Sequence, residues 1–172
     1  MTNLFTEIEN TQYPLWDYGW FDLTRFRIRD DIQSFTNNFD VIRALLTDTI
    51  YQRSFCTFPD PWGALVQRHG PFLSNKISSE WYRSITAKEL HHHVHKVIID
   101  AGLDSPPDRE QIQVVDKWVV DAGIHKNEIF IMEPPEDESL RVEWAYIWFV
   151  FTEFICINRL ARELTVAVIG YD

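Results

Sequence analysis

The chain has 172 residues, 45% of them hydrophobic, and it carries 26 acidic side chains against 16 lysines and arginines, a formal net charge of −10. This length and apolar fraction predict a single globular domain over residues 1–172 and exclude a disordered chain. The negative charge argues against direct binding of nucleic acid phosphates and favours basic partners.

The first regular pattern along the chain is an alternation. Phe26 and Ile28 alternate with Arg25, Arg27 and Arg29, which predicts a strand with one basic face. The three arginines could bind an anion, but a solvated face that pairs with neighbouring carboxylates is the simpler interpretation.

Helical patterns follow the first strand. Apolar residues recur at helical spacing over 39–50, and Asn37 or Asn38 is suited to cap that helix. A shorter helix is expected over 60–70, because an Asp-Pro pair opens the segment and a Gly-Pro pair closes it. Residues 71–83 are expected to form a loop with one helical turn.

Two amphipathic helices are the clearest elements of the sequence. Thr86 and Glu89 form a capping box that opens a helix over 87–101. A Ser-Pro-Pro-Asp sequence opens a second helix over 107–122. Each helix has one apolar stripe, so we expect both stripes to pack on a sheet.

The C-terminal third predicts strands. Residues 127–132 predict a short strand, and the β-branched and aromatic residues of 142–157 predict a strand buried on both faces. Helical spacing also fits over 140–151, so strand or helix stays open there, with strand favoured. Residues 164–169 predict a final strand that pairs with 142–157. The predicted class is α+β, with helices packed on one face of a mostly antiparallel sheet that ends in a C-terminal β-hairpin.

Four histidines lie within residues 91–95. His91 and His95 are four residues apart and share one helix face, a spacing that can hold a transition metal. No glutamate lies between them as a metalloprotease motif requires. A polar helix flank is therefore the favoured interpretation, no metal or other cofactor is expected, and His91 with His95 is the alternative.

Other catalytic signals are weak in this sequence. Cys56 and Cys156 lie in apolar surroundings without metal or redox spacing, so both are expected to be buried, inert and reduced. The sequence has no nucleophile elbow, no phosphate-binding glycine loop, no apolar run long enough to span a bilayer and no signal-peptide pattern. These features predict a cytoplasmic protein that is not an enzyme and that binds neither membrane nor nucleic acid directly.

Acidic residues are most concentrated between positions 133 and 143, a segment that contains five carboxylates and one arginine. A solvated loop that aids solubility accounts for this segment as well as a partner surface does. The acid excess supports the partner surface, since acidic faces steer basic partners. The predicted partner-binding residues are Glu133, Glu136, Asp137, Glu138, Glu143 and Trp144.

In size, negative charge, seven tryptophans and the aromatic segment Phe149-Val-Phe-Thr-Glu-Phe-Ile, the chain resembles the small acidic cytosolic immunity proteins, or antitoxins, of polymorphic toxin systems. The resemblance implies a binding protein that neutralises a basic toxin enzyme by filling its active cleft with carboxylates and aromatic rings. One alternative is a DNA mimic that inhibits a nucleic-acid-binding protein. Another is a metal-dependent enzyme that uses His91 and His95. The sequence leaves the partner's identity and the oligomeric state open.

Overall fold

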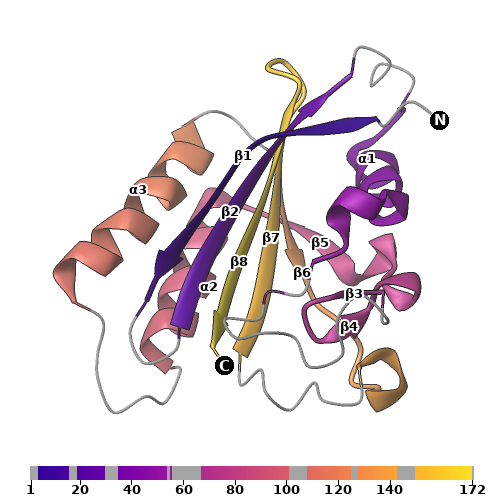
Figure 1. Cartoon of the computed structure of the whole chain (residues 1–172). Helices are drawn as coiled ribbons and strands as arrows, with labels where there is room; N and C mark the ends of the chain where they lie inside the picture. Colours follow the sequence, from indigo (N-terminus) through magenta and orange to yellow (C-terminus); the bar gives the residue numbers. More distant parts are fainter. Residues whose placement is uncertain are drawn as a thin grey trace.

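The computed structural model describes residues 4–15, 19–29, 35–53, 55, 67–100, 108–124, 128–142 and 150–171. Its centre is a six-stranded antiparallel sheet in the order β1-β2-β8-β7-β6-β5 (Figure 1). The strands of this sheet are β1 (Phe5–Pro14), β2 (Gly19–Ile28), β5 (Tyr82–Ile85), β6 (Glu128–Met132), β7 (Val150–Asn158) and β8 (Glu163–Tyr171). Two short strands, β3 (Arg68–His69) and β4 (Phe72–Leu73), pair with each other.

Helices cover both faces of the sheet. The helices are α1 (Asn38–Thr47), α2 (Ala87–Asp100) and α3 (Arg109–Ile124), and the short 3-10 turns are η2 (Thr49–Tyr51), η4 (Ser74–Lys76), η5 (Ser79–Trp81) and η6 (Glu138–Leu140). Figure 1 shows α2 and α3 on one side of the sheet and α1 with β3 and β4 on the other. We call these sides the α2–α3 face and the α1 face.

Each face has its own apolar core. On the α2–α3 face, Leu90 of α2 and Val115 of α3 pack with Phe154 of β7. On the α1 face, Ile42 of α1 packs with Ile155 of β7. The predicted α+β class is confirmed. The expectation that the helices pack on one face holds for α2 and α3 but is wrong for α1, because the apolar side of α1 is buried in the core on the opposite face.

The C-terminal hairpin is confirmed. Strands β7 and β8 pair antiparallel from Val150↔Tyr171 to Asn158↔Glu163, and β8 lies between β7 and β2. Strand β7 is central, and its alternate residues contribute to the two cores on opposite faces of the sheet. The sequence predicts this, because apolar residues occupy both the even-numbered and the odd-numbered positions of the strand. The choice between strand and helix over 140–151 is decided only at its ends, where Leu140 lies in η6 and Val150 begins β7. The strand predicted over 142–157 does not include Val142 in the structure, and residues 143–149 lie outside the described residues.

The sequence does not predict β1. This strand is the edge of the sheet, so polar residues occupy most of its positions on both faces, and Ile8 is 44% exposed. A register shift between Glu7 and Glu9 further breaks the alternation. A strand without a buried face has no period-two signal.

The predicted helix starts agree with the structure. Asn37, rather than Asn38, caps α1 by accepting from the Asp40 N–H. In the capping box of α2, Glu89 N–H donates to Thr86 Oγ1 and Thr86 N–H donates to Glu89 Oε2, at 3.2 and 2.8 Å. Asp108 and Gln111 exchange two similar hydrogen bonds at the start of α3.

Residues 60–85 differ from the prediction in two places. The helix expected over 60–70 does not reach Gly70, because Arg68 and His69 form β3 and Gly70 turns the chain with φ +54°; residues 60–66 lie outside the described part. The expected loop over 71–83 contains the short strand β4, two 3-10 turns, η4 and η5, and the start of β5. Strand β5 was missed because it has only four residues.

Two further expectations concern burial. Cys156 is buried, as predicted, and burial raises the pKa of its thiol to about 12, so it stays protonated and inert. Cys56 lies outside the described residues. Among the described helices, none is long and apolar enough to cross a bilayer.

Candidate functional site

The acidic segment forms a fixed loop between β6 and β7. We call residues 133–142 the acidic loop. At its start the Glu133 N–H donates to the Trp81 carbonyl oxygen at 2.6 Å, and at its end the Val142 N–H donates to the Pro71 carbonyl oxygen at 2.9 Å. Both anchors belong to the segment that precedes β5, so the loop is tied down at each end.

Aromatic rings support the acidic loop. Phe72 and Trp81 meet edge to face with centroids 5.5 Å apart, and the Arg141 guanidinium lies 5.6 Å from the centre of the Phe72 ring. Leu140 packs against the core of the α1 face. The backbone of the loop therefore rests on a buried base while its acidic side chains face solvent.

Two acidic side chains of the loop have partners inside the protein. Glu133 accepts from the Arg83 guanidinium at 2.8 Å, and these hydrogen bonds hold the pKa of the Glu133 carboxyl below its usual value. Asp137 accepts from the Ser139 hydroxyl and N–H, which likewise lowers its pKa. Both carboxylates are thus ionised and stabilise the loop itself.

Two other acidic side chains of the loop have no polar partner in the part of the chain that the structure describes. Glu136 and Glu138 are exposed, and neither carboxylate makes a hydrogen bond or ion pair with another residue that the structure describes. The remaining predicted residues, Glu143 and Trp144, lie outside the described ranges. The structure therefore places four of the six predicted residues in one loop, and two of these four have no polar partner within the described ranges.

The histidine cluster gains a partner from the tertiary structure. His91 and His95 stack on the surface of α2 with ring centroids 4.2 Å apart. His95 Nε2 lies 2.8 Å from Oδ1 of Asp116, which α3 contributes. One donor atom from each of the three side chains lies within 4.8 Å of the others. The sequence pairs the histidines but cannot show that Asp116 joins them, because the packing of α3 on α2 decides it.

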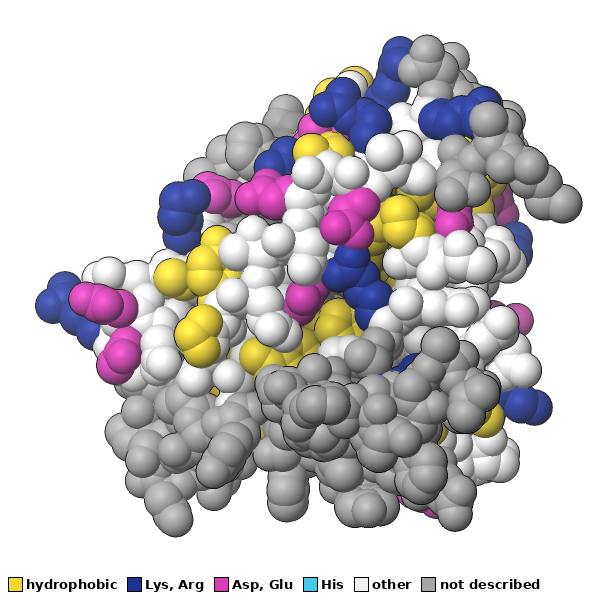
Figure 2. Space-filling model, viewed as in Figure 1, with side chains coloured by type: hydrophobic (Ala, Val, Ile, Leu, Met, Phe, Trp, Pro, Cys, Tyr) yellow, Lys and Arg dark blue, Asp and Glu magenta, His cyan; other side chains and the backbone are white. Residues whose placement is uncertain are grey.

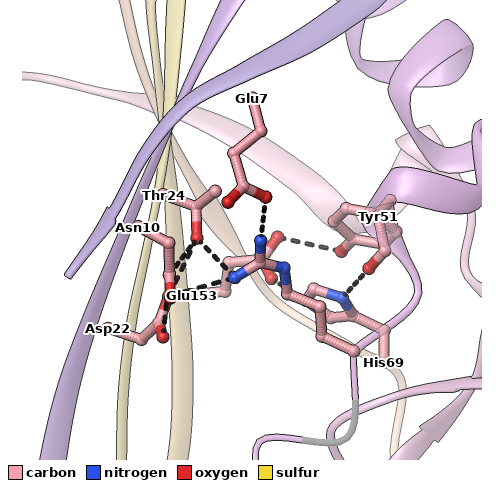
Figure 3. Close-up of polar contacts among 8 residues, drawn as sticks. Glu7, Asn10, Asp22, Thr24, Tyr51, His69 and Glu153 are labelled. Atoms are coloured by element: carbon pink, nitrogen blue, oxygen red, sulfur yellow. Dashed lines mark hydrogen bonds and ion pairs between the residues drawn. The ribbon is translucent and has the colours of Figure 1, made fainter. Parts of the chain in front are cut away.

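A buried polar cluster lies on the α1 face. Glu153 of β7 and His69 of β3 are 0% and 1% exposed, and His69 Nε2 hydrogen-bonds Glu153 Oε2 (Figure 3). The hydroxyls of Tyr51 and Tyr82 donate to Glu153 Oε1 at 3.0 and 2.6 Å. Burial, with the Glu153 charge as a second cause, raises the pKa of both tyrosines well above the ordinary value.

Both ring nitrogens of His69 are hydrogen-bonded. Nδ1 lies 2.6 Å from the Tyr51 carbonyl oxygen, and a carbonyl only accepts, so Nδ1 carries a proton. Nε2 lies against Oε2 of Glu153, so the second ring nitrogen also has its partner inside the protein. Because both ring nitrogens have partners inside the protein, His69 presents no nitrogen to a substrate or metal, and the cluster acts structurally by joining β7 to η2 and β3.

A second polar network neighbours this cluster at the β1 edge. The Arg53 guanidinium donates to Thr24 Oγ1 at 2.9 Å and pairs with Glu7 (Figure 3). Thr24 Oγ1 in turn donates to Asp22 Oδ1 at 2.9 Å, and the Asn10 amide donates to both residues. The two carboxylates on this part of the α1 face, Glu7 and Asp22, therefore share one guanidinium, and neutral donors complete the hydrogen bonds of Asp22.

The arginine-rich strand β2 is also neutralised. Arg25 pairs with Glu9 at 3.0 Å and with Glu163 at 3.2 Å, and Arg27 pairs with Glu163 at 3.2 Å. Figure 2 shows acidic and basic side chains side by side on the molecular face that carries β1 and β2, instead of an area of one sign. The interpretation of these arginines as a paired, solvated row is confirmed for Arg25 and Arg27.

A groove of about 750 Å³ lies between α3 and the strands. Tyr13 and Trp118 contribute aromatic walls, and Lys117 lines it beside Asp121, 3.1 Å away. The charged residues of the groove are already paired with one another, so they favour no charged ligand.

Comparison with known proteins finds no family model, no curated protein and no solved structure that matches this chain. The candidate sites therefore rest on their own geometry and chemistry.

Proposed function

We propose that this protein is an acidic cytoplasmic binding protein that neutralises a basic protein partner, in the manner of an immunity protein, by placing the acidic loop in the partner's active cleft. The observation that carries the proposal is the contrast within the loop. Its backbone is anchored at Glu133 and Val142, while Glu136 and Glu138 are exposed and have no polar partner among the described residues.

The anchored backbone favours tight association. A loop that already has its bound conformation loses less conformational entropy on binding than a flexible loop does. Glu133 and Asp137 maintain this conformation through their internal hydrogen bonds.

The exposed carboxylates favour a basic partner. Glu136 and Glu138 can pair with arginines or lysines of a partner, since neither forms an ion pair with any residue in the described part of the chain. The formal charge of −10 adds long-range attraction that speeds the encounter.

The DNA-mimic alternative has less support. It requires carboxylates that follow one another like phosphates. On the face that carries β1 and β2, acidic and basic side chains are interleaved instead (Figure 2), as Arg25 between Glu9 and Glu163 illustrates.

Two charge-reversed variants test the proposal. The first combines Glu136→Lys with Glu138→Lys in the acidic loop. The matched control combines Glu110→Lys in α3 with Glu128→Lys at the start of β6, two exposed positions that change the net charge equally. Wild-type protein and both variants are immobilised and exposed to lysate of the native host, and retained proteins are identified by mass spectrometry.

The expected result is one basic protein that the wild type and the control retain and that the loop variant loses. With that protein purified, the loop variant should bind more than about thirtyfold more weakly, since losing one member of a buried interfacial charge pair costs about 2–5 kcal/mol. The wild type should also inhibit the partner's activity at an equimolar ratio. Equal retention by the two variants, or binding without inhibition, would contradict the proposal.

A further inference from the structure

We propose that the surface between α2 and α3 holds a Zn²⁺ site whose ligands are His91, His95 and Asp116. This site does not depend on the function proposed for the acidic loop. It is defined by three side chains from two helices that the fold brings together.

The geometry needs only small side-chain movements to bind the ion. Zinc ligands lie about 2.0–2.1 Å from the metal in a tetrahedron, which places donor atoms roughly 3.3 Å from one another. The donor atoms of His91, His95 and Asp116 already lie within 4.8 Å of one another. His91 is exposed, so its ring can rotate toward the other two ligands.

The donor set suits zinc. Two imidazole nitrogens and one carboxylate oxygen are ligands that Zn²⁺ accepts, and three protein ligands leave the fourth position to water. His95 and Asp116 are 30% and 42% exposed, so the ion can enter from solvent.

A simple hydrogen bond between the helices accounts for only part of this arrangement. His95 Nε2 and Asp116 Oδ1, 2.8 Å apart, would join α2 to α3 without a third residue. The stacking of His91 on His95 then adds a third donor at the same place. A bound ion would replace the hydrogen bond by two coordinate bonds and link the helices more firmly.

Titration calorimetry of untagged, metal-free full-length protein with ZnCl₂ tests the proposal. The wild type should bind one equivalent and melt at a higher temperature with the metal than without it. His91→Ala and Asp116→Asn should each weaken binding by more than about tenfold, the lower end of the loss seen even for outer-shell partners of metal ligands. The amide that Asp116→Asn introduces can still accept a hydrogen bond from His95, so this substitution removes the anionic ligand without removing the contact between the helices.

The matched control is His92→Ala, which removes a neighbouring exposed histidine outside the trio and should leave the affinity unchanged. Titration with Co²⁺ gives an independent readout, because a protein site that imposes tetrahedral geometry produces intense visible absorption bands. Loss of affinity in His92→Ala equal to that in His91→Ala would overturn the site in favour of nonspecific binding by the histidine cluster. Absence of saturable binding in the wild type, or full binding by Asp116→Asn, would overturn it as well.

Discussion

Glu153 and His69 form a fully buried pair between the central strand β7 and the short strand β3, and two tyrosine hydroxyls complete the hydrogen bonds of the carboxylate. The pair joins residues 84 positions apart in the chain. A carboxylate at this depth is tolerated only with such partners, because an unpaired buried charge is strongly unfavourable.

Replacing Glu153 by Gln should lower the free energy of unfolding by about 1–3 kcal/mol, the usual cost of leaving a buried polar group without its hydrogen-bond partner. Urea unfolding measures the change. The control is Glu9→Gln, which removes an exposed ion pair with Arg25 and should cost less than about 1 kcal/mol. Equal losses in the two variants would show that the buried pair contributes no more than a surface one.

The buried tyrosines predict a loss of stability in alkali. Tyr51 and Tyr82 have pKa values well above the ordinary 10.0 in the folded protein, so they stay neutral while the unfolded chain ionises. Their contribution is complete below about pH 10 and should fall by about 1.4 kcal/mol per pH unit for each tyrosine as the pH rises above that value. Unfolding in urea at a series of pH values measures the slope. Tyr51→Phe should give a shallower slope, and an unchanged slope would assign the alkaline loss to other groups.

Gly170 should not tolerate a side chain. It lies opposite Trp20 in the β2–β8 pair, and a Cβ atom at this position would overlap the Trp20 indole. Gly170→Ala is expected to destabilise the protein by about 1–3 kcal/mol, as overpacked cores do. Thermal unfolding measures it. A double-mutant cycle with Trp20→Leu should show a coupling that offsets part of the loss, whereas additive effects would place the strain elsewhere.

The proposed partner complex should be sensitive to salt. If Glu136 and Glu138 meet basic groups of the partner, raising the ionic strength screens the long-range attraction and slows association. Stopped-flow or surface-based kinetics should show an association rate that falls with salt while the dissociation rate changes little. An association rate independent of salt would argue against electrostatic steering by the acidic loop.

Local chemistry explains which elements were predictable. The capping box at Thr86 and Glu89 opens α2. Strand β7 is apolar at both its even-numbered and its odd-numbered positions, which requires a central strand. Both elements therefore follow from short stretches of sequence. Strand β1 did not follow, because an edge strand exposed on both faces has no hydrophobic period.

The candidate sites divide in the same way. The acidic loop is visible as a charge run, and the pairing of His91 with His95 follows from helical spacing. Glu153 is a lone carboxylate in a strand that is predicted to be buried on both faces. A buried carboxylate requires a polar partner, but the sequence does not show that His69 is that partner.

The α+β class, the helix starts, the C-terminal hairpin and the position of the acidic run follow from the amino-acid sequence alone, because propensity, capping and hydrophobic period act over a few residues. Three relationships appear only in the folded chain: His69 meets Glu153, Asp116 joins His91 and His95, and Glu136 and Glu138 have no polar partner among the described residues. Each of these relationships depends on the packing of segments distant in the chain, where many pairings satisfy the same local pattern and the burial of the two cores selects one of them.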